Sequence, residues 1–434
     1  MPAALGLDFG TTNTVLSQIH ADGKARPIIC PIDGVQVEAL RSALCFWQTG
    51  GRDGRKLHVE AGPYAIRQFI DHPGECRFIQ SFKTFGASQH FPGTYIYGKR
   101  YKFEDLLEGL VARIRDYESA ELDELPRRLV VGRPVEFAGA QPDAALAQQR
   151  YDAALRRFGF AEILYVYEPV AAAFFFARNL AQSATVLVAD FGGGTTDYSI
   201  IRFELSGNRL SARPLGHGGI GIAGDNFDFR IIDNVILPRL GKGSQYRHMG
   251  KTLELPQGLF ANFARWNQLS VLKTMDEFRD LKGLLRWCVE PDKIQKLIDL
   301  IEDDQGYPLY KAISEAKARL SSNESVELRF PPLGDDFQVL VERGDFETWI
   351  ADDLRRMERV LDDVLARAQT ESAAIDKVFL TGGTSFVPAV RQIFERRFGS
   401  ERIESGDELL SIANGLAMIG EQDDAEQWAV NERT

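Results

Sequence analysis

The chain has 434 residues, 44% of them hydrophobic, which is enough to build more than one buried core. Its 51 Lys and Arg residues against 62 Asp and Glu residues give a net charge of −11. A general nucleic-acid-binding surface usually carries a basic excess, so none is expected. The cysteines, Cys30, Cys45, Cys76 and Cys288, lie far apart with no Cys-x-x-Cys spacing, which argues against a disulfide framework or a zinc site.

Neither a targeting segment nor a membrane segment is expected. The first predicted strand begins within a few residues of Met1, which leaves no room for a signal peptide. The most apolar stretch, 169–177, has about half the length that a helix needs to cross a bilayer. We therefore expect a cytoplasmic protein with no membrane or nucleic-acid partner, and we favour a monomer.

The chain opens with short strands. An apolar run from Ala3 to Leu7 predicts a buried strand, and an alternating strand from Thr14 to Ile19 follows a Gly-rich hairpin. A turn at residues 22–23 leads to a third strand that ends before Pro31. Residues 34–104 are rich in Gly, aromatic and basic residues, and we expect them to form an inserted subdomain.

Helices and strands then alternate to the end of a first lobe, which we assign to residues 1–181. The predicted elements are a helix over 103–118, a strand over 128–132, a helix over 142–158, a strand over 163–167 and a helix that opens at Glu168-Pro169. Mixed strands and helices of this kind indicate an α/β fold.

A second lobe is predicted over 182–404, because the opening pattern of the first lobe recurs there. A strand, a glycine hairpin, a strand over 197–205 and a strand over 209–215 follow one another. A mostly helical insertion is expected over 229–324. Its apolar residues at helical spacing are Val271, Met275, Phe278, Leu281, Leu284 and Leu285.

The rest of the chain is expected to complete both lobes. The predicted elements are strands over 326–330 and 337–341 that return to the sheet, a helix over 345–369 and a strand over 377–380. A helix over 405–420 is expected to return to the first lobe. Residues 421–434 form a polar tail that we expect to be frayed.

One motif occurs twice, each time at the end of a predicted buried strand. The copies are Asp8-Phe9-Gly10-Thr11-Thr12-Asn13 and Asp190-Phe191-Gly192-Gly193-Gly194-Thr195-Thr196-Asp197, which start 182 positions apart (190 minus 8). Glycines at such a bend let backbone N–H groups approach a phosphate, threonine hydroxyls add donors, and the carboxylates can hold hydrated Mg²⁺. The duplication predicts two lobes that face one nucleoside triphosphate. A protein kinase is excluded, since the tripeptide occurs twice and no His-Arg-Asp loop is present.

Two further glycine loops follow predicted strands. Residues 219–224 match Gly-x-Gly-x-x-Gly, but they lie in the second lobe rather than in an initial βαβ unit, so a Rossmann dinucleotide site is not expected. The alternative is an anion or ribose contact at the helix that begins near Asp225. Residues 382–385 precede a helix capped near Thr384 or Ser385, and they form either a ligand-approaching loop or a plain tight turn.

Taken together, the segments 6–14, 168–173, 190–200, 224–228 and 378–388 resemble the ATP site of the actin-like ATPases. Among these proteins the chain is most similar to the DnaK-type heat-shock chaperones of the seventy-kilodalton class. Because no C-terminal extension with a peptide-binding domain follows, the resemblance is strongest to the short, YegD-like branch. It implies ribonuclease-H-like duplicated lobes around a nucleotide cleft, with inserted subdomains.

The resemblance also implies roles for individual residues at the phosphate end. Asp8 and Asp190 correspond to the aspartates that hold hydrated Mg²⁺. The residues that correspond to the phosphate loops are Gly10, Thr11, Thr12, Asn13, Gly192, Gly193, Gly194 and Thr195. The residues that correspond to the catalytic set are Lys83, Glu168, Thr195 and Asp197. Without the resemblance, Lys83 would be read as a surface lysine. Pro134 and Arg150 resemble a nucleotide-sensing proline and its arginine relay.

At the adenosine end the chain departs from the family. The residues that match are Gly221, Gly224, Asp225, Lys317, Ser321, Gly382, Gly383 and Thr384. Ser314 and Ala318 stand where the family has polar contacts, and Phe386 replaces a base-stacking arginine. An aromatic face can still stack on a purine, at about 1 kcal/mol by analogy with other stacked bases.

The function that the resemblance implies is a slow, Mg²⁺-dependent ATPase with chaperone-like, nucleotide-driven opening and closing of its lobes. Its expected ligands are ATP, ADP and Mg²⁺, and its expected partners are client proteins or co-chaperones. The alternatives are a nucleotide-gated scaffold with negligible turnover, an actin-like filament protein and a small-molecule kinase.

Overall fold

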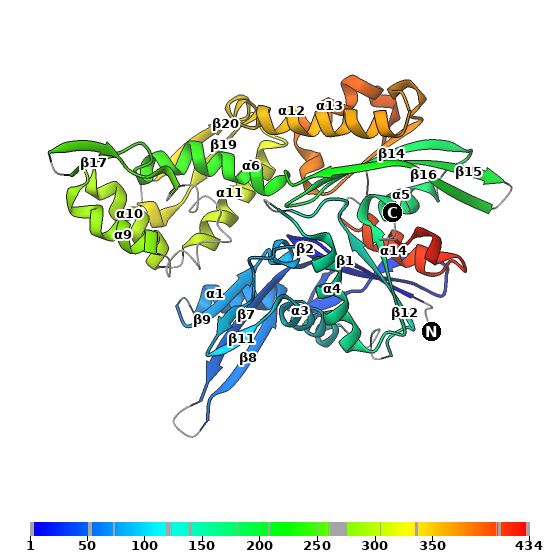
Figure 1. The fold of residues 1–434 in the computed structure, drawn as a ribbon, viewed down its shortest axis with the longest axis horizontal. Helices are drawn as coiled ribbons and strands as arrows, with labels where there is room; N and C mark the ends of the chain where they lie inside the picture. Colours follow the sequence, from blue (N-terminus) through cyan, green and yellow to red (C-terminus); the bar gives the residue numbers. More distant parts are fainter. Residues whose placement is uncertain are drawn as a thin grey trace. The chain divides into compact units, whose positions relative to one another are not determined.

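The computed structural model describes residues 4–430 apart from 51–53, 73, 119–121, 123, 139–140, 179, 207–208, 249, 259, 261–275, 304, 335–336, 405 and 407–408. The contacts between its residues divide the chain into two compact units. The first contains Met1–Gly224, Arg356–Ser385 and Val390–Thr434, and the second contains Asp225–Arg355 and Phe386–Ala389. The α/β class is confirmed (Figure 1).

The first unit contains two main sheets with the same arrangement of strands. The first sheet consists of β1 (Ala4–Phe9), β2 (Asn13–Ile19), β3 (Ala25–Pro27), β6 (Leu40–Arg41), β12 (Arg128–Arg133) and β13 (Glu162–Tyr167). The second consists of β14 (Ala184–Phe191), β15 (Thr196–Ser206), β16 (Arg209–Ile220), β21 (Lys377–Thr381) and β22 (Ile403–Glu404). In each, an antiparallel meander is extended by two parallel strands, in the orders β3-β2-β1-β12-β13 and β16-β15-β14-β21-β22. The duplication seen in the two hairpins is therefore a duplication of whole sheets.

Two apolar helices, α5 (Glu168–Ala177) and α14 (Ser411–Gly420), pack against these sheets and against each other (Figure 1). A Cβ atom on Gly415 of α14 would lie 1.8 Å from the carbonyl oxygen of Ala171 in α5, so only glycine allows this approach. Asn414 also accepts a hydrogen bond from Ser17 Oγ of β2, at 2.6 Å. The predicted helix over 405–420 thus reaches the first sheet.

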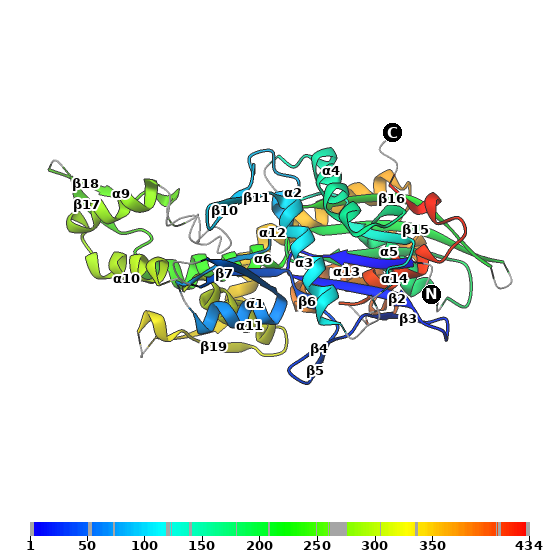
Figure 2. The ribbon, with the colours of Figure 1, turned by 90° about the horizontal axis from the view of Figure 1, so that it is seen from below.

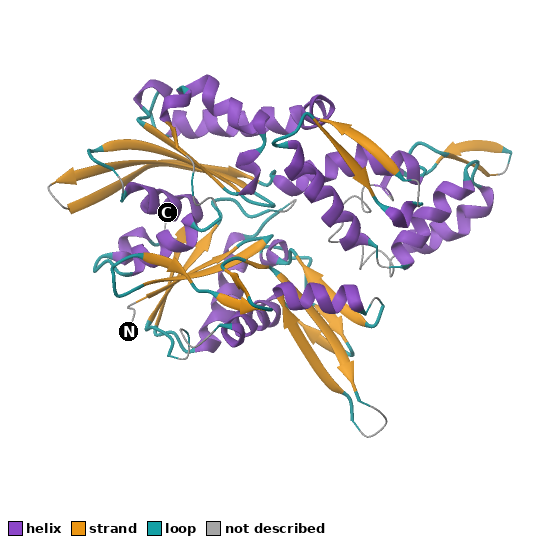
Figure 3. Ribbon diagram, turned by 180° about the vertical axis from the view of Figure 1, so that it is seen from behind, coloured by secondary structure: helices purple, strands orange, loops and turns teal. Residues whose placement is uncertain are grey.

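Other helices cover the outer faces of the two sheets. They are α3 (Phe103–Tyr117) and α4 (Ala144–Leu155) in the first lobe, and the later part of α12 (Arg343–Arg367) with α13 (Pro388–Phe398) in the second. Phe394 of α13 meets Phe191 and Tyr198 of the second sheet, with ring centroids 5.7 and 6.3 Å apart. Phe176 of α5 stacks on Phe379 on the opposite face, at 4.1 Å. Figure 3 shows the second sheet with helices on both faces.

The segment between β3 and α3 builds smaller sheets of its own. Its elements are β4 (Cys30–Ile32), β5 (Val35–Val37), β7 (Ala43–Thr49), β8 (Lys56–Ala61), α1 (Gly62–Asp71), β9 (Cys76–Gln80), α2 (Lys83–Gly86), β10 (Thr94–Ile96) and β11 (Lys99–Tyr101). The order β8-β7-β9 forms a separate sheet, whereas β6 joins the first main sheet through β2. The third predicted strand is interrupted, since β3 ends at Pro27 and β4 pairs with β5 instead.

The second unit holds most of the predicted helical insertion. Its elements are α6 (Gly224–Ile231), β17 (Gln245–His248), β18 (Lys251–Glu254), α9 (Asp276–Leu284), α10 (Pro291–Glu302), α11 (Gly306–Leu320), β19 (Ser325–Arg329) and β20 (Gln338–Glu342). Within it, the hairpin β17–β18 contacts the turn that follows α9, through a bridge between Tyr246 and Cys288 (Figure 2), and sequence reasoning missed this hairpin. Phe278 and Leu281 of the predicted helical series are buried, while Val271 and Met275 lie outside the described residues.

Three other predictions are wrong. The strands β19 and β20 pair only with each other among the described strands and do not return to the second main sheet. Thr384 and Ser385 lie in a 3₁₀ turn (Gly383–Phe386) ahead of α13, so neither caps that helix. The tail up to residue 430 is docked rather than frayed, since Trp428 packs edge-on against Phe174 at 5.4 Å and Val430 N donates to Tyr165 O at 2.8 Å. No helix in the described part of the chain is long and apolar enough to span a bilayer.

Candidate functional site

The two Asp-Phe-Gly hairpins are closed in the same way. Gly10 N donates to Asn13 O at 2.8 Å in the first hairpin, and Gly192 N donates to Thr195 O at 3.0 Å in the second. A Cβ atom on Gly10 would lie 2.5 Å from Asn13 O, so the first bend requires glycine. The same backbone hydrogen bond thus closes both bends, as expected for a duplicated hairpin.

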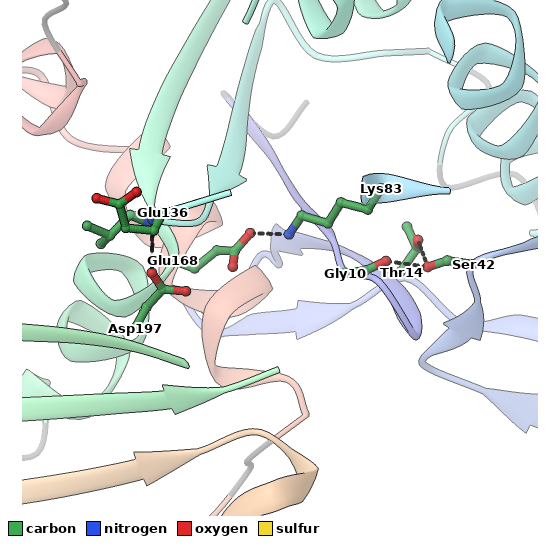
Figure 4. Close-up of polar contacts among 8 residues, drawn as sticks. Gly10, Thr14, Ser42, Lys83, Glu136, Glu168 and Asp197 are labelled. Carbon is green, nitrogen blue, oxygen red and sulfur yellow. Dashed lines mark hydrogen bonds and ion pairs between the residues drawn. The ribbon is translucent and has the colours of Figure 1, made fainter. Parts of the chain in front are cut away.

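Ser42 supports the first hairpin, and sequence reasoning missed it. Its hydroxyl donates to Gly10 O at 2.7 Å and lies 2.8 Å from Thr14 Oγ1, while Ser42 N donates to Thr12 O at 2.9 Å (Figure 4). Ser42 follows β6, which pairs with β2 next to the hairpin. A lone serine in an irregular segment carries no motif, so only the strand pairing reveals this role.

The second hairpin lies beside the first lobe. A Cβ atom on Gly194 would be 3.3 Å from Thr11 Oγ1, which brings the tips of the two hairpins together. Asp197 Oδ1 accepts hydrogen bonds from Val135 N at 2.9 Å and from Glu136 N at 3.2 Å, and both donors follow Pro134 (Figure 4). The loop after Pro134 is therefore attached directly to the second hairpin.

Two other predicted loops meet the second hairpin at one atom. Gly192 O accepts a hydrogen bond from Gly224 N and another from Thr384 Oγ1, each at 3.4 Å. Gly382 has φ +81° and stands so close to Phe191 O that its Cβ would lie 2.1 Å away. The Gly382 turn is thus built for close backbone packing. The Gly-x-Gly-x-x-Gly segment begins within the last residues of β16, which is antiparallel to β15, so it lacks the parallel unit of a dinucleotide site.

Lys83 and Glu168 form a buried ion pair. Lys83 begins α2 and Glu168 begins α5, and Lys83 Nζ donates to Glu168 Oε1 at 2.6 Å (Figure 4). The side chains are only 8% and 5% exposed, which rules out a surface role for the lysine. Burial alone would lower the pKa of Lys83, but the charge of Glu168 opposes it and the pKa lies above its usual value. Lys83 therefore stays charged.

Three aspartates at the ends of the hairpin strands carry raised pKa values. Burial, and then the charge of Glu168, raises the pKa of Asp8 and that of Asp197 to about 7. The same two causes raise the pKa of Asp190 well above its usual range. Asp197 is fully buried, and its Oδ2 accepts no hydrogen bond from the described residues. The site thus gathers several carboxyl groups around one lysine, and ionising all of these carboxyl groups is unfavourable.

This arrangement fits a hydrated cation held between phosphates and carboxylates. Among the described residues, no cluster of three or more His, Cys, Asp or Glu side chains is placed to hold a metal ion directly. Mg²⁺ seldom needs such a cluster, because it keeps several waters and takes one or two carboxylates together with phosphate oxygens. The gathered carboxyl groups and the unpartnered Asp197 Oδ2 suit that mode.

Arg150 organises the segment after Lys83. Its guanidinium donates to the carbonyl oxygens of Phe85 at 2.7 Å, Gly86 at 3.0 Å, Ser88 at 3.1 Å and Phe91 at 2.9 Å. These bonds hold the chain that leaves α2, the short helix that Lys83 begins. The predicted relay between Arg150 and Pro134 stays a prediction.

The residues predicted for the adenosine end are divided between the two units: Gly221, Gly224, Gly382, Gly383 and Thr384 belong to the first, and Asp225, Lys317, Ser321 and Phe386 belong to the second. There, Asp225 lies in the first turn of α6, Lys317 Nζ pairs with Asp228 Oδ1 at 2.9 Å, and Ser321 stands at the C-terminal end of α11. The Phe386 side chain is 55% exposed. Gly221, at the end of β16, belongs to the first unit and is exposed. Their role in base or ribose binding stays a prediction.

Comparisons with known proteins agree with this geometry. The family model described as Hsp70 protein matches residues 279–426. Chaperone protein DnaK of Mycoplasmopsis synoviae is 24% identical over 432 residues, covering 97% of this chain and 59% of the relative. Chaperone protein DnaK of Thermus thermophilus is 24% identical over 440 residues, covering 96% of this chain and 60% of the relative. The chain thus spans about three fifths of the length of these curated relatives.

Proposed function

Because the chain belongs to the DnaK-type Hsp70 family and has its actin-like ATPase fold, we propose that it binds ATP together with Mg²⁺ and hydrolyses the terminal phosphate slowly. One observation carries the proposal. The carboxyl groups of both hairpins, with Asp190 and Asp197 buried, and the buried Lys83–Glu168 pair lie in one unit, and the pKa values of the hairpin aspartates are raised. An arrangement of this kind is costly unless a cation and its anionic ligand enter it.

Each group at the hairpins has a part in this chemistry. The backbone N–H groups at the two glycine bends donate to phosphate oxygens, and Lys83 adds a positive charge close to the reacting phosphate. Asp197, held by the N–H groups of Val135 and Glu136, orients a water through its unpartnered Oδ2. Asp8 and Asp190 would hold Mg²⁺, which would supply charge neutralisation when bound. Phosphoryl transfer is then driven by positioning and electrostatics.

Steady-state phosphate release with Mg²⁺ and ATP tests the proposal. The Lys83→Ala and Asp190→Asn variants should lose almost all activity, because one removes the buried cation and the other a carboxylate for Mg²⁺. A matched control is Lys377→Ala, which removes a partly exposed lysine that pairs with Glu404 in the same unit. The control should keep wild-type turnover. Unchanged rates of phosphate release in both site variants would refute the proposed ATPase function.

We also propose a chaperone-like output, on the basis of the relatives named DnaK. The loop after Pro134 in the first lobe is bonded to Asp197 in the second, so a change at the phosphate end acts on both lobes. Closing on ATP and opening after hydrolysis is the expected result. Protease protection that differs between MgATP and MgADP supports the cycle, and equal protection contradicts it. Client proteins or co-chaperones are the proposed partners.

A nucleotide-gated scaffold with negligible turnover is the second candidate. The observation in its favour is that Lys83 is already engaged by Glu168 at 2.6 Å, which holds the lysine away from a phosphate. Thermal stabilisation by MgATP without phosphate release selects this candidate. A ligand at about 100 times its Kd adds roughly 2.7 kcal/mol, which a melting curve detects.

A further inference from the structure

Tyr151 of α4 has a buried hydroxyl whose hydrogen-bonding capacity is unused. The side chain is 1% exposed, and its ring centroid lies 5.9 Å from that of Phe9 and 5.4 Å from that of Phe103. Its hydroxyl makes no hydrogen bond among the described residues. A phenylalanine would fill the same aromatic cluster without the cost of a buried, unpartnered hydroxyl. The hydroxyl therefore needs a reason other than packing.

The charged neighbours of this hydroxyl indicate the reason. Burial raises the pKa of Tyr151 above its usual value, and the charges of Lys83 and Glu168 also act on its phenol, in opposite directions. Gly86, at the end of the helix that Lys83 begins, packs against the Tyr151 ring, since a Cβ there would lie 3.4 Å from a ring carbon. Tyr151 thus packs against the short helix that Lys83 begins, and its phenol feels the charges of the Lys83–Glu168 pair.

The pair cannot stay closed if the proposed function holds. Lys83 must turn its ammonium from Glu168 toward the bound phosphate. That movement leaves the Glu168 carboxylate buried and close to the aspartates, and losing one partner of a buried pair is strongly unfavourable. A neutral donor that takes the place of the ammonium removes much of this cost, since hydrogen bonds to charged acceptors are the stronger ones.

We propose that Tyr151 is a positioning residue for the Lys83–Glu168 pair: its hydroxyl donates to the Glu168 carboxylate when Lys83 leaves it for the terminal phosphate. The inference rests on the proposed ATP-binding function and adds to it a residue that none of the motifs contains. When Lys83 leaves Glu168, the Tyr151 hydroxyl replaces its ammonium as the hydrogen-bond donor to the carboxylate. Without this hydroxyl, breaking the Lys83–Glu168 ion pair costs more, and ATP binds more weakly.

Binding of MgATP and MgADP to the full chain, measured by calorimetry, tests this exchange. Tyr151→Phe should weaken MgATP binding roughly tenfold, the effect of losing a hydrogen bond to a charged group. Binding of MgADP, which lacks the terminal phosphate, should change little. The nucleotide-free variant should melt no lower than wild type, because the aromatic packing is kept and an unpartnered hydroxyl is removed.

A double-mutant cycle separates this role from a structural one. In a Glu168→Gln background the lysine is no longer held by a carboxylate, so Tyr151→Phe should change MgATP affinity by less than about twofold. Tyr165→Phe is the matched control in the same aromatic cluster, with ring centroids 6.5 Å apart. Its hydroxyl donates to Asp152 Oδ1 at 2.7 Å, so the change should lower stability and leave MgATP affinity unchanged.

The outcomes are distinct. Wild-type chain that binds no MgATP overturns the proposed function, and the inference falls with it. Wild-type binding together with equal affinity in Tyr151→Phe overturns the inference alone. If Tyr151→Phe loses the same affinity in the wild-type and in the Glu168→Gln background, Tyr151 has a general structural role, which also overturns the exchange.

Discussion

Replacing Asp197 by asparagine should stabilise the nucleotide-free protein at alkaline pH while lowering its activity. Asp197 is fully buried and its pKa is raised to about 7, first by burial and then by Glu168. An unfolded aspartate titrates near 3.9, so keeping the folded carboxylate charged at pH 8 costs about 4 kcal/mol as an upper limit. Asn keeps the acceptor for Val135 N and Glu136 N. Its buried amide donors cost about 1–3 kcal/mol, which leaves a smaller net gain.

The pH dependence gives the sign of the effect. Because the folded pKa is raised, the wild-type contribution to stability is present below pH 4 and is lost as pH rises through about 7. Asp197→Asn removes this loss, so we expect the melting temperature to rise by about 2–4 °C at pH 8. The gain should be smaller at pH 5.5, where the wild-type protein has lost only about 2 kcal/mol, an amount that the buried amide donors of Asn offset.

Melting curves at the two pH values, without nucleotide or Mg²⁺, make the measurement. Asp143→Asn is the control, since the hydrogen bond that the Asp143 carboxylate accepts from Leu146 N lowers the pKa of this N-cap residue. Its stabilising effect is present above the unfolded pKa and is lost as pH falls, the reverse of Asp197. A melting temperature for Asp197→Asn at or below wild type at pH 8 would refute the reasoning.

Three further predictions follow from packing and contacts. Gly415→Ala should lower the free energy of unfolding by about 2–3 kcal/mol, because its new methyl group overpacks against α5. Gly109→Ala is the control, since nothing lies within 4 Å of its new methyl group, and it should raise the free energy of unfolding by about 0.5–1 kcal/mol. Denaturant midpoints measure both changes. Ser42→Ala should cost about 1–2 kcal/mol and weaken MgATP binding, measured by calorimetry, because the first hairpin loses its support. Phe386→Ala should weaken ATP binding about fivefold with unchanged melting temperature, and equal affinity would exclude stacking on the base.

Helices and strands whose apolar residues mark their buried positions could be predicted from the sequence. The helix α5, every residue of which is buried, begins at Glu168 with Pro169 in its first turn, as expected. The strands β1 and β14 end at the duplicated motif, because apolar runs that stop at Gly-rich bends have few other solutions. The local sequence pattern is enough to predict such an element, because the residues that form it are close together in the sequence.

Pairing between distant segments was not predictable in the same way. The alternation in β19 and β20 indicates strands but does not say which partner they pair with. The docking of Trp428 on Phe174 joins an apolar ring in a polar tail to a helix far away in the sequence. The composition of such a tail predicts a frayed end, because a single aromatic residue hardly changes the average hydropathy of the segment.

The sequence by itself determined that two similar hairpins, each with aspartate, glycine and threonine, follow buried strands, since residue type and spacing encode local bends. Only the tertiary structure decided what those hairpins meet. Lys83 and Glu168 are 85 positions apart and pair in the folded chain, and Asp197 is held by backbone N–H groups that no residue type encodes. The unused hydroxyl of Tyr151 also appears only there, because whether a buried donor has a partner depends on every segment packed around it.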